Sequence, residues 1–464
     1  MGAIVSGPPT GPAAPAGRIC RMSATKPPAL VYPLHSRIKL VLLRWLYTVI
    51  MYLATPLIVY RLFVRGLKLR SYLHRWSERF GYFRSPGFQE ESIWVHAVSV
   101  GEINAAIPLI TALRERYRDW PMVVTTVTPT GSERLRQVLG DSLFHVYLPY
   151  DLPGSVRRFL GRIRPRLAII METEIWPNLY FACRKRGVPV LIANARLSER
   201  SLRGYGPVQP LAGEAIRSAT FIAAQSQTDY ERFLSLGAQP ERLALVGNIK
   251  YDIDMPHEMV ESGVEWRERA GGARRPVWIA ASTHEGEEQA VLNAHLDVLA
   301  RFPDALLIIA PRHPERFRPV AQLCESLGLR TRCRSADGTA APDTQCFVAD
   351  TLGELLRFYA ACDVALVAGS LEPIGGHNVL EPALLGKPVV VGPHTFNFAE
   401  ITELLVEQGA AVRIPDDRAL GSTICELLGD PGRMHRMGCA ATAIIARERG
   451  ALDRTLAVVS HILR

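Results

Sequence analysis

Short runs of consecutive apolar residues recur along the chain from residue 93 onward, and amphipathic stretches such as 102–117 and 285–301 lie between them. The runs are rich in β-branched residues and apolar throughout, which is typical of strands buried on both faces of a parallel sheet. Alternation of such strands with helices predicts an α/β fold. The expected strands are Ile93–Val98, Met122–Thr128, His145–Leu148, Leu167–Glu172, Val188–Ala193, Thr220–Ala224, Leu243–Val246, Val277–Ala281, Ala305–Ala310, Cys346–Val348, Val364–Val367, Pro388–Val391 and Ala411–Ile414.

The number and spacing of these strands predict two domains. About half of them precede residue 240, and a polar seam with Gly and Pro follows near 247–276. A chain of 464 residues also exceeds what one hydrophobic core usually organises. We therefore expect two Rossmann-like, doubly wound domains facing a cleft, at 67–246 and 247–464. Their ligands should bind beyond the carboxyl ends of the strands.

The N-terminal region contains a longer apolar run, Leu40–Tyr60. As a helix it would rise about 31 Å, close to the thickness of bilayer hydrocarbon, which predicts a membrane-anchor helix within 37–66. Arg44 interrupts the run, so a spanning helix and one lying in the membrane interface both fit. Residues 1–36, rich in Pro, Gly and Ala, are expected to be a disordered tail, and Met22 is an alternative start.

The positive charge of the chain is concentrated beside this run. Residues 1–79 hold twelve Lys and Arg against one Glu, whereas the whole chain has a formal net charge of +9. The body is thus near neutral, which argues against nucleic acid as a partner. Basic residues after the apolar run place the body on the cytoplasmic side of an inner membrane. Eight scattered cysteines without a Cys/His cluster exclude a disulfide scaffold, and no metal or other cofactor is expected.

Acidic residues follow two expected strands of the first half. Glu102 opens the helix after the first strand, where it could act as a general base or simply favour the positive end of the helix dipole. Glu172 and Glu174 end the strand in METEIWPN, where they could hold acceptor hydroxyls or cap a helix. Arg196, after the next strand, suits phosphate or carboxylate but also fits a solvated charged segment.

Two further motifs lie at and after the seam. Lys250 is a possible anion contact, and Asp252 and Asp254 form a D-x-D pattern, which is weak evidence for a metal because three such letters recur by chance. Arg312 follows a strand of the second half and could neutralise a leaving phosphate. His284 and His313 are more often packed or hydrogen-bonded histidines than ligands.

The stretch Gly369–Glu400 carries the strongest signal in the second half. Gly375 and Gly376 would let backbone N–H groups approach an anion before a helix expected to begin near Asn378. Glu381, in the first turn of that helix, could hydrogen-bond ribose hydroxyls. A flexible glycine loop before a capped helix is the structural alternative.

Together these motifs closely resemble the 3-deoxy-D-manno-octulosonic acid (Kdo) transferase family of Gram-negative bacteria. The resemblance covers essentially residues 40–460. It implies a GT-B glycosyltransferase fold and transfer of Kdo from CMP-Kdo to the lipid A precursor, with inversion and without a bound metal. The motifs that carry it are WVHAVSVGE (Trp94–Glu102), TTVTPTG (Thr125–Gly131), LPYD (Leu148–Asp151), METEIWPN (Met171–Asn178), NARLSERS (Asn194–Ser201), GNIK (247–250) and the Gly369–Glu400 block.

The resemblance also implies roles for individual residues. It assigns Glu102 as the general base and places Glu172 or Glu174 at the acceptor. Binding of CMP-Kdo is implied for Lys250, Arg312, Asn378 and Glu381, beside the glycine pair Gly375 and Gly376. The partners that the resemblance implies are CMP-Kdo, the lipid A precursor and the membrane.

Three alternatives remain at this stage. One is a GT-B transferase that uses another sugar nucleotide, such as a uridine-linked one. A second is a nucleotide-sugar epimerase of the same architecture, which would not need the apolar run Leu40–Tyr60. The third is a membrane-tethered binding protein without turnover, which would not need strand-end acids.

Overall fold

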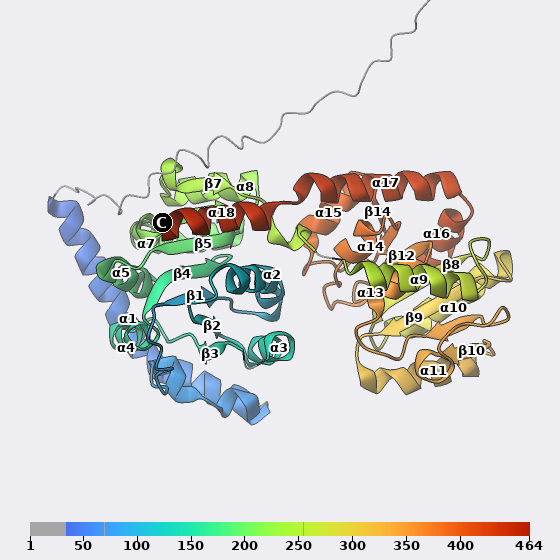
Figure 1. The fold of residues 1–464 in the computed structure, drawn as a ribbon, viewed down its shortest axis with the longest axis horizontal. Helices are drawn as coiled ribbons and strands as arrows, with labels where there is room; N and C mark the ends of the chain where they lie inside the picture. Colours follow the sequence, from blue (N-terminus) through green and yellow to red (C-terminus); the bar gives the residue numbers. More distant parts are fainter. Residues whose placement is uncertain (1–33, 69, 141, 254) are drawn as a thin grey trace, which may run out of the picture. The chain divides into compact units, whose positions relative to one another are not determined.

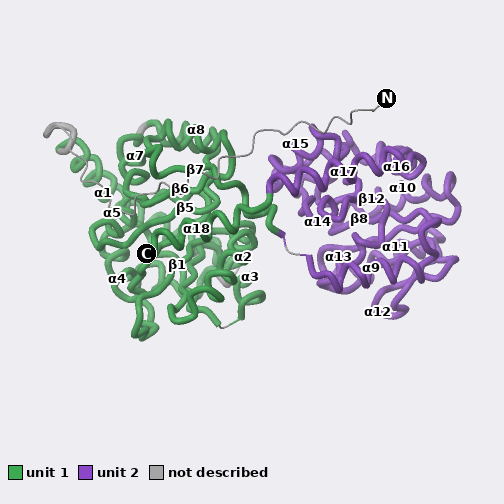
Figure 2. Tube along the Cα trace, turned by 45° about the horizontal axis from the view of Figure 1, so that its top comes forward, with its two compact units in different colours: residues 1–252, 449–464 green, residues 253–448 purple. Residues whose placement is uncertain are grey.

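The computed structural model describes residues 34–68, 70–140, 142–253 and 255–464, and the side chains of these except at a few positions near the ends of helices. Two compact units are present: unit 1 comprises residues 1–252 and 449–464, and unit 2 comprises residues 253–448 (Figure 2). The expected tail at 1–36, with Met22, lies almost wholly outside the described residues. Each unit is a parallel sheet between helices, so the predicted pair of doubly wound domains is confirmed (Figure 1).

Unit 1 contains a seven-stranded parallel sheet in the order β3-β2-β1-β4-β5-β6-β7. Helices α4, α5, α7 and α8 cover one face, and α2, α3 and α18 cover the other. The alternation along β1 shows why the strand is apolar throughout: Trp94 packs on the first face, whereas Ile93 and Val95 pack on the second. The strands are β1 (Ser92–His96), β2 (Met122–Thr126), β3 (Phe144–Tyr147), β4 (Pro165–Met171), β5 (Val190–Ala195), β6 (Phe221–Ala224) and β7 (Leu243–Leu245); the helices are α1 (Leu34–Lys68), α2 (Val100–Arg116), α3 (Pro129–Leu139), α4 (Pro153–Ile163), α5 (Pro177–Arg186), α6 (Glu199–Tyr205), α7 (Gln209–Ser218), α8 (Gln227–Leu236) and α18 (Ala451–Leu463).

Unit 2 repeats this plan with the order β10-β11-β9-β8-β12-β13-β14. Helices α10, α11, α16 and α17 cover one face of its sheet, and α9 and α13 cover the other. The strands are β8 (Val277–Thr283), β9 (Leu306–Pro311), β10 (Thr331–Cys333), β11 (Cys346–Val348), β12 (Val364–Val367), β13 (Val389–Val391) and β14 (Ala411–Arg413); the helices are α9 (His257–Arg269), α10 (Glu287–Arg301), α11 (Phe317–Ser326), α12 (Arg334–Asp337), α13 (Leu355–Ala361), α14 (Leu380–Leu384), α15 (Ala399–Glu407), α16 (Ala419–Leu428) and α17 (Pro431–Glu448).

The division between the units differs from the expected boundary at residue 247. Residues 247–252 belong to unit 1, and the chain returns to unit 1 at residue 449 to form α18. Asp252 stabilises the start of α18, because its two carboxylate oxygens accept hydrogen bonds from the backbone N–H groups of Gly450 and Leu452, each at 2.6 Å. Asp252 is therefore a cap for α18. The other half of the D-x-D pattern, Asp254, lies outside the described residues.

One strand was not expected from the sequence. The edge strand β10 has three residues, Thr331–Cys333, that are only partly buried, so it lacks the apolar run by which the other strands are recognised.

The long helix α1 contains the segment that was expected to be a membrane anchor. It extends a few residues beyond both ends of the segment 37–66 and packs against α5, α7 and the short helix η2 (Arg70–Leu73) of unit 1. Among the described residues, Ile38–Leu67 is the segment with the length and composition needed to cross a membrane.

Candidate active site

The sheet order of unit 1 places Glu102 and Glu172 beside one another. Strands β1 and β4 are neighbours at the centre of the sheet, and the chain winds outward from them in opposite directions. Glu102 follows β1 and Glu172 follows β4, so both emerge where the strand order reverses. In open α/β sheets this position leaves a crevice for ligands.

Glu102 is held by the turn that precedes its helix. Ser99 is the N-cap of α2, and its hydroxyl accepts a hydrogen bond from the Glu102 backbone N–H at 3.4 Å. In return, Glu102 Oε1 accepts from the Ser99 hydroxyl at 3.1 Å, and Oε2 accepts from the Val98 backbone N–H at 2.8 Å. This reciprocal arrangement is a form of capping box. The structural and catalytic interpretations of Glu102 are thus compatible, because the cap fixes the carboxylate in place.

The surroundings of Glu102 favour its protonated form. Burial raises the pKa of this carboxyl to about 7, and the negative charges of Glu172 and Glu174 act in the same direction. The hydrogen bonds from Val98 and Ser99 oppose the rise, since they favour the ionised form. A carboxyl with a pKa near neutrality can accept a proton and release it again, which is what a general base requires.

Glu172 adopts a backbone conformation that is unusual for its residue type. Its φ is 55°, in the left-handed region, where an L-residue costs about 1–2 kcal/mol. Its carboxylate lies 3.3 Å from the ammonium of Lys250. Glu174 is also partly buried, its carboxylate accepts from Trp176 Nε1 at 2.7 Å, and burial raises its pKa.

Asn194, which the sequence does not single out, brings Lys250 to this position. It lies buried at the end of β5 with a φ of 51°, and its side-chain oxygen accepts from the Ile249 backbone N–H at 2.9 Å. Lys250 is the next residue, so the side chain of Asn194 joins the Lys250 segment to the centre of the sheet. Lys250 therefore lies in unit 1, whereas the sequence-based boundary assigned it to the second domain. Arg196, two residues after Asn194, is exposed beyond β5.

In unit 2, Arg312 lies at the corresponding edge of the sheet. It follows β9 and is exposed at a pocket whose wall also includes Ser282, near the end of β8, and Thr351, after β11. The guanidinium is thus available beside a hollow at the carboxyl ends of three adjacent strands.

The backbone of the loop after β12 favours glycine at both positions of the pair Gly375 and Gly376. Gly375 has a φ of 109°, and a Cβ there would collide with Phe396 and Asn397. Gly376 has a φ of 75°, and its N–H donates to the carbonyl of Gly369 at 2.6 Å. That N–H is therefore already engaged within the loop. The helix that follows begins at Leu380, two residues later than expected, and has only five residues.

Asn378 and Glu381 form a pair in this segment. The Asn378 side-chain amide donates to Glu381 Oε1 at 3.0 Å, and its oxygen accepts from the Leu380 backbone N–H at 3.1 Å. Burial raises the pKa of Glu381. The amide thus orients the carboxyl that was predicted to reach a ribose.

Three histidines gather where the strand order of unit 2 reverses, between β8 and β12. The rings of His284 and His377 are parallel, with their Nε2 atoms 2.8 Å apart, and the His313 ring meets His284 edge-on. Burial, with the positive charge of Arg312 and its histidine neighbours, lowers the pKa of His377 to about 4. His377 was not proposed from the sequence, because its partner His284 is distant along the chain.

The left-handed backbone at Glu172 yields a prediction about stability. Glu172→Gly and Glu172→Ala both remove the carboxylate, but only glycine accepts a φ of 55° without a steric penalty. We expect Glu172→Gly to be more stable than Glu172→Ala by up to about 1 kcal/mol. Urea unfolding of both variants measures the difference.

The same pair of substitutions at Glu174 is the control. Glu174 has no left-handed φ, so glycine should be less stable than alanine there by about 0.4–1 kcal/mol, because glycine gives the unfolded chain more conformational freedom. A lower stability of glycine at both positions would contradict the strain at Glu172.

Comparison with known proteins supports a single family. The family described as "3-Deoxy-D-manno-octulosonic-acid transferase (kdotransferase)" matches residues 74–253. A 3-deoxy-D-manno-octulosonic acid transferase of Haemophilus influenzae is 39% identical over 422 residues, which cover 90% of this chain and 99% of that protein. The protein of the same description from Bordetella pertussis is 38% identical over 426 residues, which cover 86% of this chain and 97% of that protein.

A solved structure supports the fold. UDP-GlcNAc 2-epimerase from Neisseria meningitidis, 13% identical, aligns with a TM-score of 0.52 over 81% of this chain and all of that one. The sequence similarity, in contrast, favours the transferase over the epimerase, because it extends over nearly the full length of the two transferases. The chain belongs to the 3-deoxy-D-manno-octulosonic acid transferase family and is a glycosyltransferase.

Proposed function

We propose that this glycosyltransferase moves Kdo from CMP-Kdo to the lipid A precursor (lipid IVA), with inversion, at the cytoplasmic face of the inner membrane. The observation that carries the proposal is the environment of Glu102. It combines a fixed carboxylate, a pKa raised to about 7 and a position where the strand order reverses. These are the properties of a general base at a ligand site.

The proposed reaction is a single displacement. Glu102 takes the proton from the acceptor hydroxyl, and the oxygen forms a bond to the anomeric carbon of Kdo. The bond from that carbon to the phosphate oxygen breaks, and its electron pair leaves with CMP. One base and one displacement give inversion at the anomeric carbon.

On the acceptor side, we assign the residues around Glu102 in unit 1. Glu174 and Glu172 would hold acceptor hydroxyls, and the exposed Arg196 suits a phosphate of the lipid. Lys250 was expected to contact the donor. Its ion pair supports a different role, in which it orients Glu172 and balances its charge.

On the donor side, we assign residues of unit 2. Arg312 would bind the phosphate of CMP-Kdo, because its guanidinium is exposed at a pocket. Glu381, oriented by Asn378, would accept hydrogen bonds from the ribose, and Gly375 and Gly376 would shape the loop before them. The exposed apolar residues of α1 support a membrane-bound acceptor.

The reaction is tested with CMP-Kdo and lipid IVA. We expect CMP release only when the lipid is present, with Kdo recovered in the lipid product. Glu102→Gln should lower the rate about 10²–10⁴-fold because the proton acceptor is lost, and it should leave CMP-Kdo binding within about twofold. Product analysis and calorimetric titration measure the two effects.

The matched control is Glu115→Gln, an exposed residue on the same helix, which should keep wild-type turnover. Near wild-type turnover by Glu102→Gln would refute the base assignment. Release of free Kdo without any acceptor requirement would refute the transfer.

The raised pKa of Glu102 predicts the pH dependence. Only the ionised carboxylate accepts a proton, so kcat/KM should fall about tenfold per pH unit below pH 7. Glu174→Gln removes a negative charge that raises the Glu102 pKa, so this descending limb should move to lower pH. A limb that stays in place in Glu174→Gln, measured from pH 5 to 9, would contradict the coupling.

Binding of CMP tests the donor assignment separately. Arg312→Ala should weaken CMP binding about 10–100-fold, since a charged hydrogen bond to phosphate is lost. Arg318→Ala, which removes an exposed arginine from nearby α11, serves as the control and should leave the affinity unchanged. Equal affinities for CMP in the two variants, measured by calorimetry, would contradict the role of Arg312.

A further inference from the structure

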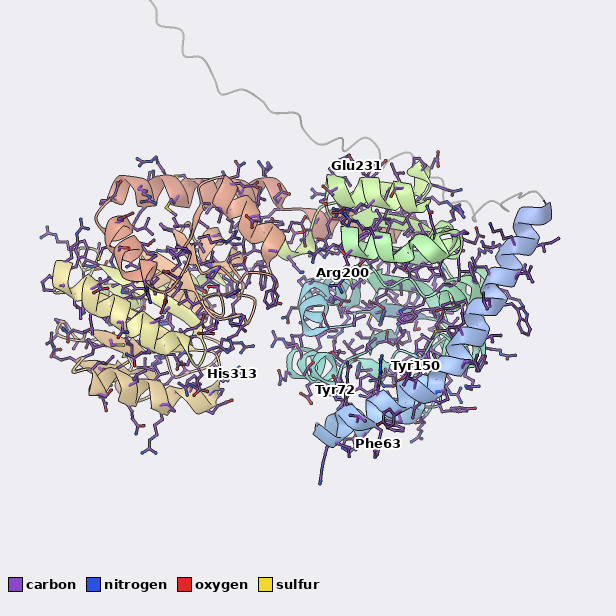
Figure 3. All side chains as sticks on the ribbon, turned by 180° about the vertical axis from the view of Figure 1, so that it is seen from behind. Phe63, Tyr72, Tyr150, Arg200, Glu231 and His313 are labelled. Carbon is purple, nitrogen blue, oxygen red and sulfur yellow. The ribbon has the colours of Figure 1, made fainter. Side chains whose placement is uncertain are left out.

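The middle of helix α1 lies along the body of unit 1, and its first turns extend past the body. Figure 1 shows it passing beside α5 and α4, and Figure 3 shows the same course from behind, with Phe63 labelled on the helix and Tyr150 on the body. This course bears on whether the helix crosses the membrane, which the apolar run Leu40–Tyr60 alone leaves open.

The polar side chains within the apolar run contact the body. The Tyr47 hydroxyl donates to Asp151 Oδ2 at 3.0 Å, and Arg44 Nε donates to the side-chain oxygen of Asn178 at 3.4 Å. The Arg44 guanidinium also lies over the ring of Phe181, 4.6 Å from its centre. The residues that interrupt the hydrophobicity of α1 are thus satisfied by protein groups.

Asp151 and Asn178 belong to the folded body, where they are only 1% exposed. Asp151 accepts hydrogen bonds from the backbone N–H groups of Asn178 and Leu179, at 2.9 and 2.8 Å, and so caps the start of α5. Detaching α1 would break the hydrogen bonds of Tyr47 to Asp151 and of Arg44 to Asn178, which is unfavourable. The junction of Tyr47 with Asp151 therefore holds α1 in place.

The contact continues toward the C-terminal end of the helix. Met51, Ile58 and Leu62, on the same face of the helix as Tyr47, are partly buried. From Arg44 to Leu62 the helix rises about 27 Å, which is close to the roughly 30 Å thickness of bilayer hydrocarbon. A spanning α1 would consequently carry polar parts of unit 1 into the hydrocarbon, where their backbone groups could not be hydrated.

The other side of α1 is an apolar stripe. Its members are spaced by one, three or four residues, as on one face of a helix, and are exposed, 70% at Trp45 and 75% at Leu53. Arg61 and Arg65 are exposed at the same helix, where they suit anionic headgroups. The stripe consists of Leu42, Trp45, Leu46, Val49, Ile50, Leu53, Leu57, Tyr60, Val64 and Leu67.

We infer that α1 is a monotopic anchor, which lies in the surface of one leaflet with its apolar stripe among the acyl chains. The chain before α1 and the body of unit 1 are then on the same side of the membrane. This inference rests on the membrane attachment in the proposed function, and specifies its geometry.

Protease accessibility tests the topology. The full-length protein carries one epitope tag at each terminus, and it is compared in spheroplasts and in inverted inner-membrane vesicles. We expect both tags to be digested in inverted vesicles and both to be protected in spheroplasts. Digestion of the N-terminal tag in spheroplasts alone would overturn the monotopic anchor while leaving membrane attachment intact. Recovery of the wild-type protein in the soluble fraction would overturn the attachment itself.

A pair of variants tests the stripe. Leu53→Glu should lower binding to vesicles of phosphatidylethanolamine and phosphatidylglycerol at least about tenfold, because a charge replaces a lipid-embedded leucine. The control is Val264→Glu, at a 53% exposed valine on α9 of unit 2, which should bind as the wild type does. Unchanged vesicle binding by Leu53→Glu would overturn the inference. A dimer that crosslinking detects in the wild-type protein and not in Leu53→Glu would overturn it as well, because a second copy would then cover the stripe.

Discussion

The pairing of β1 with β4 is the constraint on which the candidate active site of unit 1 depends. The two strands run parallel in a fixed register that ends with His96 opposite Ile170. Both are buried on each face, so a shift by one residue would turn core side chains to the wrong layer. Because the register is fixed, the turns after the strands leave the sheet side by side. The short capping turn then brings Glu102 toward Glu172 without any contribution from flexible loops.

Unit 2 also gathers polar residues where its strand order reverses, but the residue types differ. Histidines and glycines follow β8 and β12 in unit 2, whereas carboxylates follow β1 and β4 in unit 1. Glu287 ties these two strand ends together, because its buried carboxylate accepts from the backbone N–H groups of His284, Gly369 and Leu371. A structural acid thus supports the loops in unit 2, whereas in unit 1 Glu102 both caps its turn and remains a candidate base.

Much of this architecture could be predicted from the sequence, and the failures have identifiable physical causes. Continuous apolar runs marked every strand except β10, whose partly buried residues carry no such signal. Glu102, Glu172 and Arg312 were found because strand ends are local in sequence. Asn194, His377 and the placement of Lys250 were not, since each depends on a contact between distant segments. Chain order alone cannot reveal that Asp252 joins Gly450.

This last contact makes unit 2 an insertion within unit 1. The chain leaves unit 1 after Asp252 and re-enters at Arg449, and the hydrogen bonds from Gly450 and Leu452 to Asp252 keep the exit and the re-entry adjacent. Any segment whose own ends lie close together could therefore be spliced in at this position without breaking the sheet of unit 1. The fold thus allows unit 2 to be exchanged as a cassette, while the sheet of unit 1 and helix α1 are retained.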